Sequence, residues 1–212
     1  MYEAERDELI NILKKRGIVN SKVLEAFNKV ERHQFVPDIM KQHAYEDVAL
    51  PIGYGQTISQ PYTVAFMTEA LNPQPGQKIL EIGTGSGYQA AILYSMGVRV
   101  FTIERNFELY NNALKIFDSL RLKIAARCSD GTIGWEEFAP YDGIIVTAGG
   151  PMIPENLKKQ LAIDGKLIIP VGNKQSQTMK IITKKSPEKY FTREVPYFAF
   201  VPLIGKEGWK EK

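Results

Sequence analysis

Apolar residues recur at three- and four-residue spacing in two stretches near the start of the chain, which is typical of amphipathic helices. The first predicted helix covers residues 3–16, and Gly17 follows it where a helix commonly ends. The second covers residues 22–30, with Asn20 or Ser21 in the place of a capping side chain. Helical extensions are therefore expected ahead of any sheet.

From residue 63 onward, helical patterns alternate with short continuous apolar runs, which are typical of buried strands. The expected helices are 63–71, 88–96, 107–120 and 156–161, and the expected strands are 78–82, 98–103, 123–127, 141–146 and 167–171. Three further strands, 178–183, 190–195 and 198–203, follow with no helix between them. This order predicts an α/β fold with a doubly wound, mostly parallel sheet and an antiparallel C-terminal edge.

A long passage without helical or strand periodicity, residues 45–61, precedes the alternating part. Its prolines and glycines predict an irregular loop, while its tyrosines and low charge argue against disorder. A loop of this length is usually functional. With 212 residues and 44% hydrophobic content, the chain is expected to form a single domain of N-terminal helices with this loop (1–62), a central core (63–172) and C-terminal strands (173–212).

The composition narrows the functional classes. Lysine and arginine outnumber aspartate and glutamate only by 27 to 24, and the charges are scattered, so no nucleic-acid partner is expected. The single cysteine, Cys128, excludes an internal disulfide, and with only His33 and His43 beside it no metal-binding cluster is expected. The acidic N-terminus and the lack of an apolar run of about 20 residues predict a soluble, cytoplasmic protein without membrane association.

A glycine-rich turn between a predicted strand and a predicted helix is the most informative motif. Glycines allow positive φ and carry no Cβ, so backbone N–H groups and the N-terminus of the next helix can approach a ligand closely. The dinucleotide fingerprint places its third glycine five residues after the first, whereas here Gly83, Gly85 and Gly87 fall within four. NAD therefore fits this spacing poorly.

Two acidic residues stand at the ends of neighbouring predicted strands. Glu81 precedes the glycines by two positions, and Glu104 ends the next strand, where an acid can bind a ribose diol. The expected ligand is a nucleoside that lacks a pyrophosphate but carries a cation, a description that suits S-adenosylmethionine. The alternative is that the glycines form only a tight strand-to-helix connection.

The stretch from Glu81 to Gly87 resembles the first motif of the seven-strand S-adenosylmethionine-dependent methyltransferases, which have a Rossmann-like sheet. Residues 49–61, Ala-Leu-Pro-Ile-Gly-Tyr-Gly-Gln-Thr-Ile-Ser-Gln-Pro, resemble the signature of the protein-L-isoaspartate (D-aspartate) O-methyltransferase family. The resemblance extends over nearly the whole chain, through residues 30–37, 81–89, 130–131, 141–148, 153–154, 167–172 and 200–203.

This resemblance implies methyl esterification of the free carboxylate of L-isoaspartyl residues in damaged proteins and peptides, with D-aspartyl residues as a second candidate substrate. The ester then closes to a succinimide, and hydrolysis of that ring restores some normal linkages. A carboxylate has an unperturbed pKa of roughly 4, so it is already ionised at neutral pH and needs no general base. The scarcity of histidine agrees with this chemistry. For the oligomeric state, we expect a monomer.

The resemblance also implies residue roles. Ser59 is the active-site residue, which would orient the acceptor carboxylate; alternatively it only caps the next helix or forms a serine turn. The residues expected to contact S-adenosylmethionine are Gln56, Thr57, Ile58, Glu81, Gly83, Gly85, Gly87, Glu104, Asp130 and Gly131. Among these, Glu81 faces the methionyl end, Glu104 the ribose, and Asp130 the adenine amino group.

Two of these roles have a simpler structural alternative. Asp130 could be only a turn former within Ser129-Asp130-Gly131. Val201 and Pro202, with Phe200, would line the substrate peptide groove, but on pattern alone they belong to an edge strand that a proline ends.

Two other functions compete with this interpretation. A nucleic-acid methyltransferase would carry a polar-proline-aromatic motif after the fourth strand, and residues 147–150 contain neither a proline nor an aromatic residue. A non-enzymatic cofactor-binding module would not need the intact loop around Ser59. The chain also departs from the family at residues 148–152 and at Ser129, which leaves the shape of the acceptor pocket open.

Overall fold

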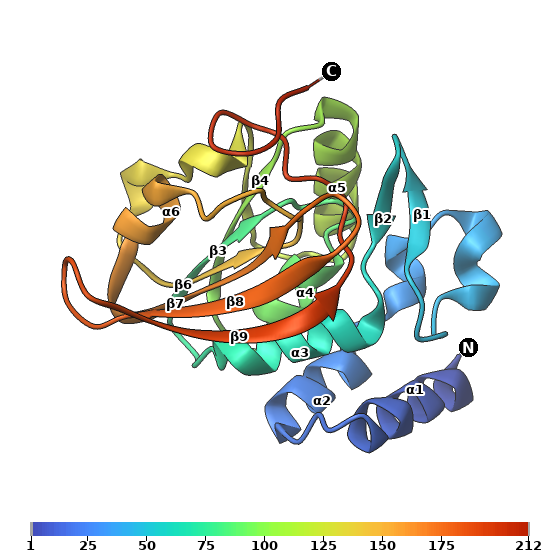
Figure 1. The fold of residues 1–212 in the computed structure, drawn as a ribbon. Helices are drawn as coiled ribbons and strands as arrows, with labels where there is room; N and C mark the ends of the chain where they lie inside the picture. Colours follow the sequence, from blue (N-terminus) through green and yellow to red (C-terminus); the bar gives the residue numbers. More distant parts are fainter. Residues whose placement is uncertain (1, 212) are drawn as a thin grey trace.

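A seven-stranded sheet forms the centre of the computed structural model, which describes residues 2–211 (Figure 1). Its strands lie in the order β5-β4-β3-β6-β7-β8-β9. Their bounds are β3 Lys78–Ile82, β4 Arg99–Glu104, β5 Ala125–Cys128, β6 Tyr141–Val146, β7 Leu161–Gly172, β8 Gln177–Lys184 and β9 Tyr190–Phe198. The strands β3, β4, β5, β6 and β7 are parallel to one another. The β7-β8 and β8-β9 pairs are antiparallel, which confirms the predicted sheet.

Helices cover both faces of this sheet because successive side chains of a buried strand point in opposite directions. Ile79 of β3 packs with three helices, α3 (Pro61–Leu71), α4 (Tyr88–Ser95) and α5 (Phe107–Ser119). Leu80, the next residue, packs on the other face with the short helix α6 (Glu155–Lys159) and with residues near the 3-10 turns η3 (Gly131–Ile133) and η4 (Glu136–Phe138). Such continuously apolar strands are expected of a sheet buried on both sides.

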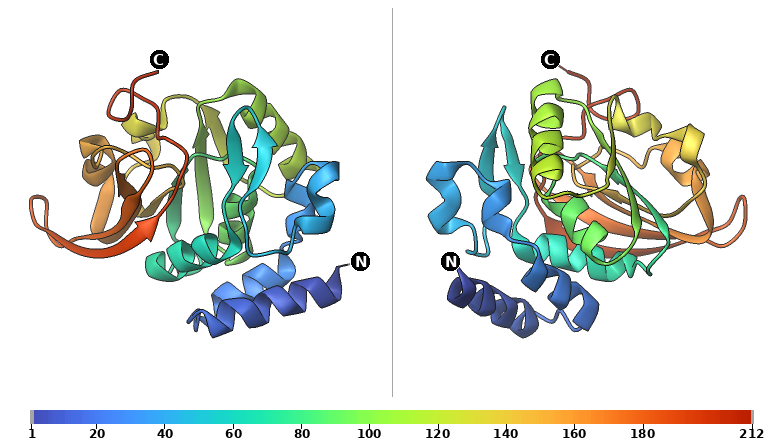
Figure 2. Two further views of the ribbon diagram at one scale, coloured as in Figure 1. Left: turned by 45° about the vertical axis from the view of Figure 1, so that its right-hand side comes forward. Right: turned by 180° about the vertical axis from the view of Figure 1, so that it is seen from behind.

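The N-terminal segment forms the predicted helices α1 (Glu3–Lys15) and α2 (Ser21–Lys29), followed by the 3-10 turns η1 (Arg32–Phe35) and η2 (Asp38–His43). In Figures 1 and 2, α1 and α2 lie below α3, away from the upper end of the sheet. The Asn20 side chain accepts hydrogen bonds from the N–H groups of Lys22 and Val23, so it is the cap of α2. This segment buries its own apolar cluster against α4.

The prediction of an irregular loop at 45–61 was wrong in part, because the passage contains a two-stranded hairpin. Strands β1 (Leu50–Gly53) and β2 (Gln56–Ile58) pair antiparallel, with Leu50 opposite Ile58 and both side chains buried. Gly53, Tyr54 and Gly55 turn the chain with positive φ at all three positions. The prolines and glycines that indicated a loop are thus the turn and flanks of a hairpin.

The predicted strand at 198–203 was also wrong, because β9 ends at Phe198 and the chain then leaves the sheet edge. Gly149, just after β6, donates to the carbonyl of Val201 and accepts from the N–H of Leu203. This returning segment crosses the end of β6 instead of extending the edge. The largest boundary shift is at β7, which begins at Leu161 instead of 167 because α6 already ends at Lys159, and the other boundaries moved by three residues or fewer. Within residues 2–211, no helix is long and apolar enough to cross a membrane.

Candidate active site

A cavity of about 560 Å³ opens at the carboxyl ends of β3, β4 and β6, where the chain leaves β3 toward β4 on one side and β6 lies on the other. Ligands of open α/β sheets bind at such a reversal of strand order, and the volume suits a small-molecule ligand. Most of the predicted site residues line it: Gln56, Thr57, Ile58, Ser59, Glu81, Gly83, Gly85, Glu104, Gly131, Val201 and Pro202. Gly87 and Asp130 are not among the lining residues.

The glycine turn is shaped by positive backbone angles and by close neighbours. The φ angles of Gly83, Gly85 and Gly87 are 93°, 53° and 87°. A Cβ on Gly83 would lie 2.5 Å from the Oγ1 of Thr147, whose hydroxyl donates to the carbonyl of Gly83 at 2.7 Å. Gly87 serves packing instead, because a Cβ there would meet the ring of Phe117 at 2.6 Å. A larger residue at Gly83 or Gly87 would therefore displace the turn and its backbone from the cavity wall.

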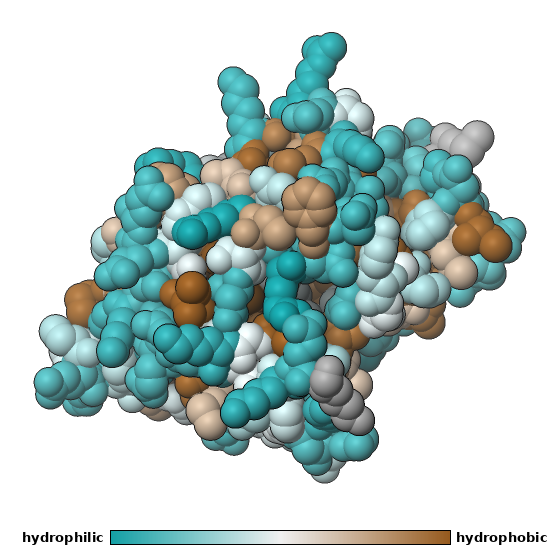
Figure 3. Space-filling model, turned by 90° about the horizontal axis from the view of Figure 1, so that it is seen from above, coloured by the Kyte–Doolittle hydropathy of each residue, from teal (hydrophilic) through white to brown (hydrophobic). Residues whose placement is uncertain are grey.

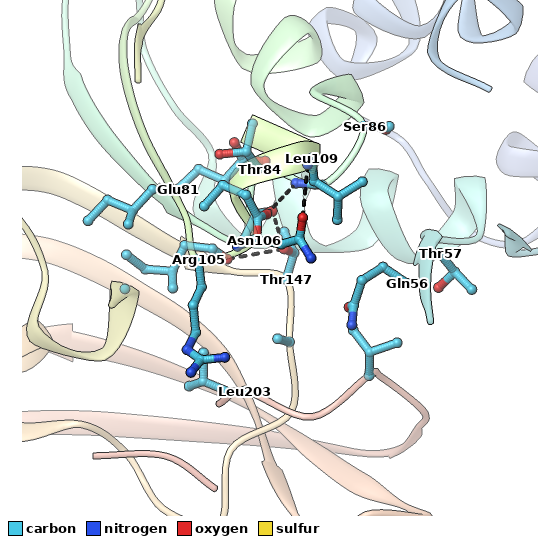
Figure 4. A pocket seen from close by; sticks show the side chains of 18 of the residues that line it. Gln56, Thr57, Glu81, Thr84, Ser86, Arg105, Asn106, Leu109, Thr147 and Leu203 are labelled. Carbon is cyan, nitrogen blue, oxygen red and sulfur yellow. Dashed lines mark hydrogen bonds between the residues drawn. The ribbon is translucent and has the colours of Figure 1, made fainter. Parts of the chain in front are cut away.

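Glu81 lies at the wall of the cavity (Figure 4), and its side chain is fully buried. Its Oε2 accepts from the hydroxyl of Thr102, whose oxygen is in turn 2.6 Å from the Oγ1 of Thr84. Its Oε1 has no hydrogen-bond partner within residues 2–211. Burial raises the pKa of Glu81 to about 8. An unpartnered carboxylate oxygen at a cavity wall fits a cationic donor such as an ammonium group.

Glu104 is also buried, but both of its oxygens are occupied. One accepts from the N–H of Gly85 and the other from the N–H of Asn106, each at 2.8 Å. Asn106 in turn caps α5 by accepting from Leu109 (Figure 4). Glu104 thereby ties the glycine turn to the start of α5, and each oxygen keeps a lone pair that a ribose hydroxyl can use.

Asp130 makes the contacts of a turn former. One carboxylate oxygen accepts from the N–H and the hydroxyl of Thr132, and the other accepts from the N–H of Lys206 at 2.7 Å. Its neighbour Gly131 lines the cavity, and a Cβ there would lie 2.4 Å from the Cγ2 of Ile82. Contact between Asp130 and an adenine amino group stays a prediction.

The C-terminal segment closes one side of the cavity, which the sequence pattern did not indicate. Ile204 and Glu211 line it, and Arg105 donates two hydrogen bonds to the Glu211 carboxylate at 2.8 and 2.6 Å. The indole N–H of Trp209 donates to the carbonyl of Gly149 at 3.0 Å. In Figure 2 this segment lies over the upper end of the sheet. These residues carry no local motif, so only the fold brings them here.

A second cavity of about 570 Å³ lies between the hairpin, the start of α3 and the segment after β9. It shares Thr57, Ser59, Thr147 and Val201 with the first cavity. Figure 3 looks onto this upper face, where hydrophilic and hydrophobic side chains border a hollow. Ser59 thus stands where two cavities of similar size meet.

The alternative role expected for Ser59, capping the next helix, is performed by Asp47. The Asp47 carboxylate accepts from the N–H of Tyr62, in the first turn of α3, at 2.8 Å, and it also accepts from the side chains of Gln60 and Arg16. Within residues 2–211 the Ser59 hydroxyl has no hydrogen-bond partner. It is therefore free to contact a ligand at the junction.

The sheet, the glycine turn and the two buried acids at the strand ends are those of the S-adenosylmethionine-dependent methyltransferase class. The family model described as protein-L-isoaspartate(D-aspartate) O-methyltransferase (PCMT) matches residues 4–208. The chain belongs to this family.

Individual relatives agree with the family match. A protein-L-isoaspartate O-methyltransferase of Chlorobium phaeobacteroides strain DSM 266 is 55% identical, covering 96% of this chain and 94% of the relative. The corresponding protein of Chlorobium phaeovibrioides is 50% identical, covering 100% and 95%. A solved protein-L-isoaspartate O-methyltransferase superposes with a TM-score of 0.88 at 30% identity over 96% of this chain and 67% of its own. A Plasmodium falciparum homologue with S-adenosyl-L-homocysteine bound gives 0.81 at 27% identity, over 93% and 97%.

Proposed function

We propose that the chain transfers the methyl group of S-adenosylmethionine to the free carboxylate of isoaspartyl residues at the junction of its two cavities. The observation that carries this proposal is the position of Ser59, which lines both cavities with a hydroxyl that no residue of the range 2–211 engages. Family membership identifies the reaction, and the cavities, the buried acids and the free Ser59 hydroxyl support the residue roles that we propose.

The first cavity has the donor and acceptor groups that S-adenosylmethionine requires. When bound, S-adenosylmethionine supplies an electrophilic methyl group on a sulfonium. Glu81 offers its unpartnered Oε1 to the ammonium group, and Glu104 offers its oxygens to the ribose hydroxyls. Gly83 and Gly85 admit the ligand to the backbone, and residues 56–58 of the hairpin form the opposite wall.

The second cavity receives the peptide, and Ser59 orients its carboxylate. The Ser59 hydroxyl and the N–H of Gln60, neither of which is used within residues 2–211, are neutral donors at the junction. Neutral donors hold an anionic oxygen without removing its nucleophilicity. No general base is needed, because the acceptor carboxylate is already ionised at neutral pH. Orientation and exclusion of water supply the rate enhancement.

The product is a methyl ester, and the rest of the repair needs no further catalysis. The peptide nitrogen that follows attacks the ester carbonyl and expels methanol, because methoxide leaves more readily than hydroxide. The resulting succinimide opens by addition of water at either carbonyl, and one of these openings restores the normal aspartyl linkage. The enzyme therefore has only to perform the methyl transfer.

We expect two substitutions to separate the roles of the cavities. Ser59→Ala removes a donor to the acceptor and should lower kcat by about 10- to 100-fold with little change in S-adenosylhomocysteine affinity. Glu104→Ala should weaken S-adenosylhomocysteine binding by about 10-fold or more, because it removes ribose contacts and releases the glycine turn.

The assay uses methyl-labelled S-adenosylmethionine with RNA and with matched peptides that contain L-isoaspartate, D-aspartate or L-aspartate. Base-labile label on the isoaspartyl peptide alone, or on the isoaspartyl and D-aspartyl peptides, is the expected result. Label on RNA, or on none of these substrates, contradicts the proposed function. The opposite pattern for Ser59→Ala and Glu104→Ala contradicts the role assignment alone.

The remaining expectations from the sequence concern the cell and the assembly. We expect a cytoplasmic enzyme that acts as a monomer on isoaspartyl proteins and peptides, without a nucleic-acid partner. One free cysteine, Cys128, suits a reducing compartment. Light scattering of the purified protein measures the oligomeric state, and a stable dimer contradicts the monomer.

A further inference from the structure

Arg32 is a fully buried cation that lines neither cavity. It lies in η1, within the segment 30–37 that has no part in the mechanism given above. Burying a guanidinium is costly unless the charge is compensated. The charge of Arg32 therefore requires an explanation.

The contacts of Arg32 leave much of that charge uncompensated. Its Nη2 donates to the backbone carbonyl of Ser59 at 2.9 Å and more weakly to that of Val48 at 3.4 Å. Its Cζ lies 4.9 Å from the centre of the Tyr88 ring, at the start of α4. Its Nε and Nη1 have no hydrogen-bond partner, and none of the ion pairs within residues 2–211 includes it.

Arg32 stays charged at neutral pH despite this environment. Burial lowers the pKa of Arg32 to about 10, which is still well above neutrality. Tyr88, Asp47 and Tyr45 favour its charged form, in that order, and the carboxylate of Asp47 is already held by Arg16, Gln60 and the N–H of Tyr62. A positive charge thus lies directly behind the Ser59 carbonyl.

The peptide unit between Ser59 and Gln60 connects this charge to the acceptor site. In a trans peptide the C=O and the N–H point in opposite directions, so the N–H of Gln60 is directed away from Arg32. Gln60 lines the second cavity, and a hydrogen bond to the Ser59 carbonyl polarises the same peptide unit and strengthens its N–H as a donor. The guanidinium of Arg32 can thus attract an acceptor carboxylate through this peptide unit without contacting the carboxylate oxygens.

We propose that Arg32 is a positioning residue that draws the anionic acceptor carboxylate to the junction and holds the Ser59-Gln60 peptide as its donor. This inference rests on the proposed function, and it adds a source of charge to a site whose direct donors are neutral. A guanidinium in direct contact would bind the nucleophilic oxygen tightly and slow its attack. One intervening peptide unit provides attraction without that contact.

The test compares two peptides with two neutral variants. One peptide carries isoaspartate, and its analogue carries isoasparagine, with a carboxamide in place of the free carboxylate. In the wild type, preferential binding of the carboxylate peptide to the enzyme saturated with S-adenosylhomocysteine tests the proposed function itself. Arg32→Met should weaken the binding of the carboxylate peptide by about 10-fold or more and leave the affinity for the carboxamide peptide within about 2-fold of the wild type. Arg32→Lys should restore most of the preference.

A merely structural role gives a different result. The proposal is overturned if Arg32→Met weakens the binding of both peptides equally, or if it weakens the binding of S-adenosylhomocysteine to the same extent. Arg32→Gln keeps an amide donor without the charge, so it separates charge from hydrogen bonding and replaces the methionine variant if that one does not fold. If both neutral variants retain the wild-type preference, the proposal also fails.

Arg6→Met is the matched control. Arg6 lies in α1, its Nε is also buried without a partner, and its ion pair with Glu31 spans 3.7 Å. Its removal should lower the free energy of unfolding while the preference for the carboxylate peptide stays unchanged. A loss of preference equal to that of Arg32→Met would show a general effect of arginine removal and would contradict the proposal.

Discussion

Two glutamates at neighbouring strand ends have opposite environments. Glu104 accepts from two backbone N–H groups, whereas Glu81 is fully buried with one oxygen unpartnered. Burial favours the protonated form of Glu81 until a cation arrives. Sequence position alone gives both residues a cofactor role, but only the structure shows that their hydrogen-bond partners differ.

Binding of S-adenosylhomocysteine should release a proton from Glu81 near neutral pH. The pKa of Glu81 is raised to about 8 by burial, and a bound ammonium group lowers it again. Calorimetry at pH 6.5 in buffers of different ionisation enthalpy measures this release, and we expect nearly one proton. The release should shrink above pH 9, where the carboxyl is already ionised. Glu81→Gln should remove it, and an unchanged value in that variant would contradict the assignment.

The same carboxyl should make the stability of the ligand-free enzyme depend on pH. Its folded-state pKa lies above its unfolded value of 4.5, so the folded state binds the proton more tightly. This contribution is fully present below pH 4.5 and is lost as the pH rises through about 8. Urea unfolding at pH 5 and pH 9 should show the wild type losing stability relative to Glu81→Gln. A constant difference between the two proteins would exclude this linkage.

At the level of elements, the hairpin β1-β2 and the start of α3 are held together by one side chain. Asp47 caps α3 through Tyr62 and also accepts from the Gln60 side chain, so it fixes the residues on either side of Pro61 at the helix entry. The hairpin and the cap leave the Ser59 hydroxyl free at the junction. This division of labour explains how a serine beside a helix start can serve the substrate.

Removal of the cap should cost stability and activity together. We expect Asp47→Ala to lower the free energy of unfolding by about 1–2 kcal/mol, the usual value of a capping side chain. Asp47→Asn keeps a capping oxygen and should retain most of it, although its pair with Arg16 is lost. Urea titration measures both variants. Equal losses in the two would mean that the ion pair, and not the cap, stabilises this region.

The sequence predicted most elements because their patterns are local. Continuous apolar runs identified the buried strands, and Asn20 was among the two caps expected for α2. The hairpin was missed because its strands are only four and three residues long and contain the prolines and glycines of a loop. Gly149 and Arg105 have partners more than 50 residues away, and Asp47 caps α3 from 15 residues before Tyr62, so no local pattern could indicate their roles.

At the level of the whole molecule, the chain returns to its own cofactor cavity at the end. The segment after β9 lies across the end of β6, and Glu211 pairs with Arg105 at the cavity wall. Asp130 anchors the same segment through the N–H of Lys206. The closure therefore joins two residues of the central core to the C-terminal segment.

Deletion of residues 206–212 should speed the release of S-adenosylhomocysteine. The deletion removes the Arg105 to Glu211 pair and the Trp209 contact with Gly149, while the central sheet keeps its strands. We expect a severalfold increase in the dissociation rate, measured by stopped-flow competition. Trp209→Phe should give a smaller increase. A dissociation rate equal to that of the wild type would show that the segment does not retain the cofactor.

In the proposed function, the second cavity restricts which damaged sites can be repaired. Ser59 lies on its wall, between the hairpin and the segment after β9, so an acceptor carboxylate that Ser59 orients has to enter this groove. A lesion inside a rigid helix or a packed strand of a client protein cannot do so until that region opens. The turnover rate on a folded client should therefore follow the client's own local unfolding equilibrium. Methylation by this enzyme would then report which segments of a client protein unfold locally.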